Sequence, residues 1–204
     1  MNKKTIIVAS SNQGKIKEIK EIFKEYEVLP LKEAEKILGK RLNVNEEQDT
    51  FKDNALEKVR GLYNQVGENY ICIADDSGIS IDAIDGFPGV HTARWMDADD
   101  HIKNIHLLKK IEGIEKENRT CHYTTVIALK SKNIEETFEY TLDGIVADNY
   151  RGDNGFGFDE IFELPSGLTL AEISTEEKFL LSPRKKALDQ VNNFVKKKLN
   201  RTQK

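Results

Sequence analysis

The chain has 204 residues, enough for one compact domain or for two small lobes that share a sheet. Its 31 basic and 35 acidic residues give a formal charge of -4, which does not favour bulk attraction to nucleic acid or to an anionic membrane. Two cysteines, Cys72 and Cys121, are too few for a disulfide framework, and no apolar run approaches the roughly 18 residues of a membrane span. We therefore expect a cytoplasmic protein with two buried thiols.

The first half of the chain alternates strand and helix patterns. Short apolar, β-branched runs predict strands, and apolar residues at helical spacing predict amphipathic helices. In chain order these are a strand at 6–9, a polar turn at 10–15, a helix over 16–23, a short helix or a loop at 33–42, a helix over 51–63, a strand at 71–74 and a half-exposed strand at 79–84.

The second half continues the alternation. It predicts a turn at 86–89, a helix over 99–111, antiparallel strands at 121–129 and 137–145, a glycine-rich loop at 150–157 and a final helix over 182–199. The basic end of that helix, Lys196 to Lys198 with Arg201 and Lys204, is better explained as a solvated helix end than as a nucleic-acid site. Interleaved elements without repeats or linkers predict an α/β fold with a mixed sheet.

Acidic side chains cluster at two places. Asp75 and Asp76 follow an apolar strand, and the carboxyl ends of such strands are where open α/β sheets bind ligands. Adjacent carboxylates are best tolerated where a divalent cation neutralises them, although a solvated turn is the alternative. Glu46, Glu47 and Asp49 precede a helix, where one Glu could join an Asp around Mg²⁺; a charged helix N-terminus is again the alternative.

Basic side chains could meet an anion. Lys15 follows a strand and a glycine turn and begins a helix, so a phosphate there would meet N–H donors, the helix dipole and an ammonium. Other candidates of the same kind are Lys58, Lys178, Arg184 and Lys185. The spacing of a Walker A loop is absent, and each lysine taken singly also fits a solvated surface.

The loop Gly152-Asp-Asn-Gly-Phe-Gly-Phe-Asp159 could enclose a planar ligand. Its glycines let the backbone approach closely, and Phe156 or Phe158 could stack on a base. The alternative is a tight loop with core aromatics. Its spacing does not match a dinucleotide fingerprint, and the four histidines have no metal-ligand spacing.

Seven segments occur together, in this order, in one known family. They are Ser10-Ser-Asn-Gln-Gly-Lys15, Asp49-Thr-Phe-Lys-Asp-Asn-Ala-Leu-Glu-Lys58, Ala74-Asp-Asp-Ser-Gly-Ile79, Gly86-Phe-Pro-Gly-Val-His-Thr-Ala-Arg-Trp95, Gly155-Phe-Gly-Phe-Asp159, Ala171-Glu-Ile-Ser-Thr-Glu-Glu-Lys178 and Ser182-Pro-Arg-Lys-Lys-Ala-Leu188. The chain resembles the inosine triphosphate pyrophosphatase family, the Ham1-like enzymes that act on noncanonical purine nucleotides, nearly from end to end.

The resemblance implies a single nucleoside triphosphate pyrophosphatase domain over residues 1–204. Its fold would be an elongated mixed sheet flanked by helices, with two lobes around a central cleft, and it would form a homodimer. Its activity would be Mg²⁺-dependent cleavage of ITP, dITP and XTP between the α- and β-phosphates, which clears them from the nucleotide pool.

The resemblance also implies roles for individual residues. Asp76 would be the general base, with Lys15 and Lys58 meeting phosphate charge, and Glu46, Glu47, Asp75 and Asp76 would be the candidate metal ligands. The substrate would be bound by Ser10, Ser11, Asn12, Gln13, Gly14, Lys15, Ser77, Phe156, Gly157, Phe158, Asp159, Lys178, Pro183 and Arg184.

The sequence departs from the family pattern at three places. The family's two glutamates fall five and six residues before the phenylalanine of its Thr-Phe motif; here these offsets reach Glu46 and Asn45, while the acidic pair is Glu46-Glu47, so which Glu meets the metal stays open. Pro183 replaces a histidine of the nucleobase pocket, and Glu160 stands where proline is common.

Purine selectivity follows from hydrogen-bond chemistry. Hypoxanthine and xanthine carry a 6-oxo acceptor, which Arg184 could meet, whereas adenine presents an amino group. We expect Arg184→Ala to lower ITP hydrolysis far more than it affects folding. The rival hypotheses are a pyrimidine or modified-nucleotide pyrophosphatase of the Maf-like kind and a nucleotide-binding protein without activity, which Asp75 and Asp76 argue against.

Overall fold

The structure is a computed structural model that describes residues 4–199. The chain forms two compact units, the first from the residues up to Asp76 with 125–140 and the residues from Arg184 on, the second from 77–124 and 141–183. Arg201 and Lys204 of the predicted basic tail lie outside the described residues.

The first unit has parallel strands at its centre. Its elements are β1 (Thr5–Val8), α1 (Gln13–Ile22), β2 (Glu27–Pro30), α2 (Leu31–Leu38), α3 (Phe51–Val66) and α6 (Pro183–Leu199), with the first part of β3 (Ile71–Ile81). Strand β1 pairs in parallel with both β2 and β3, and Ile7 lies opposite Leu29 on one side and Cys72 on the other. The short apolar runs thus form the buried strands that their composition predicts.

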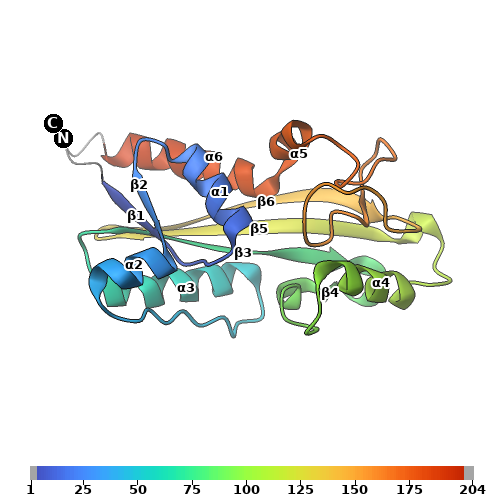
Figure 1. The fold of residues 1–204 in the computed structure, drawn as a ribbon, viewed down its shortest axis with the longest axis horizontal. Helices are drawn as coiled ribbons and strands as arrows, with labels where there is room; N and C mark the ends of the chain where they lie inside the picture. The colour runs from blue at the N-terminus through green and yellow to red at the C-terminus, as the bar shows by residue number, and fades with distance from the viewer. Residues whose placement is uncertain (1–3, 200–204) are drawn as a thin grey trace. The chain divides into compact units, whose positions relative to one another are not determined.

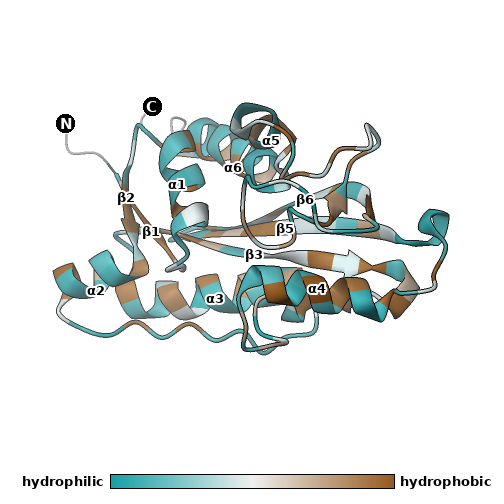
Figure 2. Ribbon diagram, turned by 45° about the vertical axis from the view of Figure 1, so that its right-hand side comes forward, coloured by the Kyte–Doolittle hydropathy of each residue, from teal (hydrophilic) through white to brown (hydrophobic). Residues whose placement is uncertain are grey.

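Two hydrophobic cores cover opposite faces of these strands, with helices α1 and α6 on one face and α2 and α3 on the other (Figure 1). Ile6 and Val8 point into the core with α1 and α6, whereas Ile7 points into the core with α3. Figure 2 shows apolar residues along the strands and mixed apolar and polar residues on α2 and α3. This is the pattern of helices that bury one side and leave the other in water.

The second unit contains the remaining elements. They are β4 (Phe87–Pro88), α4 (Asp100–Lys110), β7 (Phe162–Glu163) and α5 (Thr175–Leu181), with short 3-10 helices at Asp82–Ile84, Gly89–His91 and Lys116–Asn118. A core of its own includes Ile79 from β3, Leu107 from α4 and Phe158 from the glycine-rich loop. Strands β5 (Thr120–Ser131) and β6 (Ile134–Val146) contribute residues to both units.

The strands form one mixed sheet in the order β2-β1-β3-β5-β6-β7, with β4 paired to β3. The pairs with β1 are parallel, and those of β4 with β3 and of β7 with β6 are antiparallel. The predicted α/β class with a mixed sheet and flanking helices is therefore confirmed.

The structure corrects the sequence prediction at several elements. Strand β3 runs without a break from Ile71 to Ile81, so Asp75 and Asp76 lie inside a strand and not at its end. Helix α1 begins at Gln13, two residues before Lys15, and the doubtful stretch at 33–42 contains helix α2, Leu31–Leu38. Strand β2 and helix α5 were not predicted.

Both thiols are buried, as predicted. Burial raises the pKa of Cys72 to about 12, so this thiol stays protonated at neutral pH. None of the helices within residues 4–199 has the length and apolarity that crossing a membrane requires.

Candidate active site

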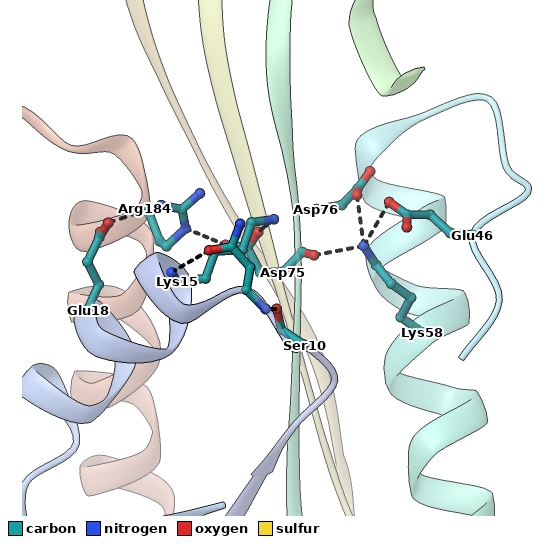
Figure 3. A network of polar contacts seen from close by, with 9 residues as sticks. Ser10, Lys15, Glu18, Glu46, Lys58, Asp75, Asp76 and Arg184 are labelled. Atoms are coloured by element: carbon teal, nitrogen blue, oxygen red, sulfur yellow. Dashed lines mark hydrogen bonds and ion pairs between the residues drawn. The ribbon is translucent and has the colours of Figure 1, made fainter. Parts of the chain in front are cut away.

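Two neighbouring aspartates at the middle of β3 point to opposite faces of the sheet. Ile71 and Ile73 belong to the core with α1 and α6, and Cys72 and Ala74 belong to the core with α3. Because side chains alternate along a strand, residue 75 continues the first set and residue 76 the second. Figure 3 shows this arrangement, with Asp75 turned toward Lys15 and Arg184 and Asp76 turned toward Lys58.

Asp75 is the centre of a buried charge network. Lys15 Nζ donates to its Oδ1, and Arg184 Nε donates to its Oδ2 at 2.7 Å. Arg184 also donates from Nη1 to Glu18 Oε1 at 3.1 Å, and only 2% of Arg184 is exposed. Two cations from helices α1 and α6 therefore share one carboxylate of β3.

These pairings decide the charge states within the network. Burial alone would raise the pKa of Asp75, but Arg184 and Lys15 outweigh it and hold this pKa well below its ordinary value. Burial lowers the pKa of Lys15, an effect that Asp75 partly offsets and that the nearby Arg184 and Lys58 reinforce. At neutral pH Asp75 is consequently a carboxylate.

Lys58 joins the other aspartate to a glutamate. Its Nζ lies 2.8 Å from Asp76 Oδ1, 2.8 Å from the backbone oxygen of Asp75 and 3.1 Å from Glu46 Oε1. The ammonium has three donors, and each of them meets one of these oxygens. Lys58 is 5% exposed, so the three acceptors hold a charge that burial would otherwise destabilise.

Asp76 keeps one carboxylate oxygen without a hydrogen-bond partner. Its Oδ2 is buried and unpaired, and only 3% of the residue is exposed. Burial raises the pKa of Asp76 above the ordinary carboxyl range, the adjacent Glu46 carboxyl raises it further, and Lys58 opposes both effects. A carboxyl group with a raised pKa and a vacant oxygen is suited to accept a proton or to bind a cation.

A residue that the sequence analysis did not select positions Glu46. Asn54 on α3 is fully buried; its Oδ1 accepts from Gln48 N at 2.9 Å, and its Nδ2 donates to Gln48 O at 3.1 Å. These two bonds fix the segment that carries Glu46 against the helix. The sequence contained a signal for this residue, because Asn54 lies within the segment 49–58 that carries the family resemblance.

The two candidate glutamates have different surroundings. Glu46 is half-buried beside Lys58, whereas the side chain of Glu47 is exposed. Asp75 has both carboxylate oxygens in ion pairs with Lys15 and Arg184. The arrangement therefore favours Glu46 and Asp76 as ligands over Glu47 and Asp75, and it separates the aspartate pair that the sequence analysis considered as one site.

The predicted phosphate loop is shorter than expected. Asn12 caps helix α1, since its Oδ1 accepts from Lys15 N at 3.1 Å, and Asn12 N donates to Ser10 Oγ at 3.2 Å. Gln13 and Gly14 lie in the first helical turn, where N–H groups have no intrahelical acceptor. Ser11 is exposed. The loop thus offers helix N–H groups near the Lys15 ammonium, as the anion hypothesis requires.

A second group of candidate residues comes together in the glycine-rich loop of the other unit. Asp159 Oδ2 accepts from Lys178 Nζ and from Phe156 N, the latter at 2.8 Å. The Lys178 ammonium lies 4.8 Å from the centre of the Phe156 ring. Asp159 is 3% exposed and Phe156 is 43% exposed, so a buried carboxylate lies beside an accessible ring.

The structure distinguishes the two phenylalanines. Phe158 is buried and packs edge to face on Tyr123, with ring centres 4.8 Å apart. Its place in the hydrophobic core argues against the predicted contact with a base and leaves Phe156 as the ring on which a base could stack. The alternative of a loop with core aromatics is thus confirmed for Phe158, whereas stacking of a base on Phe156 stays a prediction.

The remaining predicted residues lie at element boundaries. Ser77 follows Asp76 in β3 and is half-buried, and Pro183 is the first residue of helix α6, a position that suits proline. Arg184 comes next but is engaged with Asp75 and Glu18, so its predicted contact with the 6-oxo group stays a prediction that its burial does not favour.

The family profile, the curated relatives and the most similar solved structures point to the same family. The profile described as "Ham1 family" matches residues 6–194. A dITP/XTP pyrophosphatase of Caldanaerobacter subterraneus subsp. tengcongensis is 40% identical over 199 residues, which cover 95% of this chain and 97% of that protein. Another from Listeria monocytogenes is 39% identical and covers 91% and 92%.

Solved structures agree with this. The Staphylococcus aureus Ham1 protein superposes with a TM-score of 0.85 at 32% identity, covering 96% of this chain and 100% of that one. A dITP/XTP pyrophosphatase from Mycobacterium abscessus superposes with a TM-score of 0.76 at 33% identity, covering 92% and 98%.

Proposed function

Because the chain belongs to the Ham1 family, we propose that it hydrolyses ITP, dITP and XTP to the nucleoside monophosphate and pyrophosphate and so clears them from the nucleotide pool. The observation that carries the proposal is the contact of Lys58 with Asp76 and Glu46. A buried carboxyl with one free oxygen lies there beside a lysine ammonium and a second carboxylate.

The residues present fit a magnesium ion. Within residues 4–199 no group of three or more ligating side chains is arranged to hold a metal. Magnesium, however, commonly takes one or two carboxylates and completes its shell with water and substrate phosphate. The Glu46 carboxylate can supply one such ligand, with Asp76 next to it as the metal-associated carboxylate. When bound, the ion would neutralise charge on the triphosphate.

Asp76 would act as the general base. A general base works best when its pKa lies near the pH at which the enzyme operates, and the raised pKa of Asp76 brings this carboxyl group closer to neutral pH. The attacking water gives its proton to Asp76, its oxygen bonds to phosphorus, and the anhydride bond between the α- and β-phosphates breaks. Lys58 holds Asp76 Oδ1 at 2.8 Å, which orients Oδ2 and keeps it available for the proton.

Lys15 would receive negative charge from the triphosphate. In the structure its ammonium is paired with Asp75, and a phosphate oxygen could replace or share that partner. Arg184 holds the other oxygen of Asp75, so Asp75 keeps a counter-ion when Lys15 turns toward substrate. The N–H groups of Gln13 and Gly14 would add neutral donors at the same helix end.

Selectivity against adenine would come from the loop around Phe156. The Lys178 ammonium is a donor and the Asp159 carboxylate an acceptor, and hypoxanthine and xanthine offer a 6-oxo acceptor next to an N1–H donor. Adenine presents the opposite pattern at these atoms, which would leave a buried charge without its partner. The exposed Phe156 ring supplies a stacking surface.

A substrate panel tests the proposal. Pyrophosphate release is measured with Mg²⁺ from ITP, XTP, dITP, ATP, GTP and dTTP. We expect release from the first three and little from the others. Release mainly from dTTP would assign the chain to the Maf-like activity, and binding of ITP without release would make it a nucleotide-binding protein.

We also propose, on the family resemblance alone, that the protein is a homodimer in the cytoplasm. Light scattering on the purified full chain measures its mass directly. A mass close to twice 23.3 kDa is expected, and a mass of one chain over the micromolar range would contradict the dimer.

A further inference from the structure

Helix α4 is hydrogen-bonded to the loop that carries Phe156 and Asp159. Asp100 Oδ2 accepts from Gly157 N at 2.8 Å, and Asn104 Nδ2 donates to Gly157 O at 2.8 Å. Asp100 and Asn104 are four residues apart, which places both side chains on one face of the helix. One helix face thus binds the N–H and the C=O of the same glycine.

The hydrogen bonds of the Asn104 side chain explain why this polar residue is buried. Only 1% of Asn104 is exposed, although it lies on a helix whose neighbouring residues Ile105 and His106 are exposed. A buried amide without partners would be destabilising, and its donors meet Gly157 O and, at 3.4 Å, Glu160 Oε2. The amide is therefore placed for its contact with the loop.

The loop needs such support because of its backbone. Gly155 has φ +103° and Gly157 has φ +67°, both in the left-handed region that favours glycine. Glycine is the residue that loses the most backbone freedom on ordering, so an unrestrained loop would sample many conformations. A Cβ at Gly155 would also overlap Asp159 and Lys178, so the loop's shape depends on close backbone packing.

A second contact joins helix α4 to the residue that follows the loop. Glu160, which stands where the resembling family commonly has proline, bonds to His101 Nδ1 through Oε2 at 2.8 Å. His101 in turn packs edge to face on Tyr150, with ring centres 4.6 Å apart. The first turn of α4 thus holds the loop at Gly157 and again at Glu160.

We infer that Asp100 and Asn104 are positioning residues for nucleobase binding, because they hold the Gly157 peptide and thereby fix the Phe156 ring and the Asp159 carboxylate before substrate arrives. This inference rests on the proposed function of the loop. Neither residue has to touch the substrate. If the inference is right, the affinity for ITP depends on α4, whereas the rate of the chemical step does not.

Steady-state kinetics with ITP test this dependence. Asn104→Ala and Asp100→Ala each remove about one hydrogen bond, so we expect KM to rise about tenfold with kcat within twofold of the wild type. Asp100→Asn keeps an acceptor oxygen and should restore KM to within twofold. His106→Ala, exposed on the same helix, is the matched control and should match the wild type. An unchanged KM in both alanine variants, or an equal rise in His106→Ala, would overturn the inference.

Amide hydrogen exchange separates this inference from the proposed function. Without nucleotide, the N–H of Gly157 should exchange at least tenfold faster in Asn104→Ala and Asp100→Ala than in the wild type, while core amides of β3 keep their protection. Unchanged protection at Gly157 would refute the inference that Asp100 and Asn104 hold this peptide, whether or not the protein hydrolyses ITP. If the wild type does not release pyrophosphate, the proposed function fails and this exchange result still stands.

Discussion

Arg184 and Asp75 are 109 residues apart in the sequence, yet Arg184 Nε donates to Asp75 Oδ2 at 2.7 Å and each residue is 2% exposed. A buried charge is stable only while it is paired, and removing one partner leaves the other uncompensated. Lys15 shares the same carboxylate. The residues predicted to meet substrate are therefore also part of what holds β3, α1 and α6 together.

Arg184→Ala should lower the free energy of unfolding by about 3–5 kcal/mol, since it leaves the buried carboxylate of Asp75 and the half-buried carboxylate of Glu18 with one cation fewer. Urea denaturation measures the change. Lys185→Ala is the control, because the ion pair of Lys185 with Asp189 is partly exposed and its loss should cost less than about 1 kcal/mol. A loss below about 1 kcal/mol in Arg184→Ala would contradict the network. It would agree with the expectation from sequence that this change has little effect on folding.

Glu46→Gln should raise the Mg²⁺ concentration needed for half-maximal ITP hydrolysis by about tenfold or more, since Glu46 lies beside the free oxygen of Asp76. Glu47→Gln should leave the magnesium curve unchanged, because its side chain is exposed. The measurement is pyrophosphate release over a magnesium titration. The reverse order of effects would assign the ligand to Glu47.

The two loop phenylalanines should fail in different ways. Phe156→Ala should raise KM for ITP about tenfold with little change in thermal stability, because the exposed ring is lost only as a stacking surface. Phe158→Ala should lower the free energy of unfolding by about 3–5 kcal/mol, because it empties a core position beside Tyr123. Thermal melts and kinetics on both variants decide, and a stable Phe158→Ala with a raised KM would show that Phe158 contacts the base.

His122 should titrate above the ordinary histidine range. Its Nδ1 lies 2.7 Å from Asp143 Oδ1 and its Nε2 lies 3.1 Å from Asp82 Oδ2. The hydrogen bond to Asp143 contributes most to raising the pKa of His122; burial opposes it, and Asp82 raises the pKa further. Since the folded pKa is the higher one, the stabilisation is complete below the unfolded pKa of about 6.5 and is lost as pH rises through the folded value.

Proton NMR of the His122 ring measures this pKa. Asp143→Asn should move it down toward the ordinary value, and the stability gained on acidifying from neutral pH should shrink with it. Asp85→Asn, a change on the same unit at a carboxylate that does not contribute to the raised pKa of His122, is the control. A ring that titrates at or below about 6.5 in the wild type would refute the two ion pairs.

The sequence predicted the elements whose pattern is local. The apolar runs of β1 and of the first half of β3 and the helical spacing of α3 and α4 needed no information from elsewhere in the chain. Strand β2 was missed because it has only four residues and ends in Pro30. The continuity of β3 was missed because Asp75-Asp-Ser-Gly78 has the composition of a turn.

What keeps that segment in a strand comes from distant parts of the chain. Asp75 is held by Lys15 and Arg184, which lie 60 and 109 residues away, and Asp76 by Lys58, 18 residues away. A single sequence shows that these charged residues exist, but not which of them pair. The family resemblance named most of the candidate residues. The separation of Asp75 from Asp76 and the support from Asn54 depend on pairings between distant residues and required the structure.

The most direct test of the account is pyrophosphate release from ITP by the wild type and by Asp76→Asn at saturating Mg²⁺, with both proteins shown to be folded. If Asp76 is the general base, the variant should lose about 10²- to 10⁴-fold in kcat, because asparagine keeps the shape of the side chain but cannot take the proton. A variant that retains more than about a tenth of the wild-type kcat would contradict the assignment of Asp76 and the mechanism built on it.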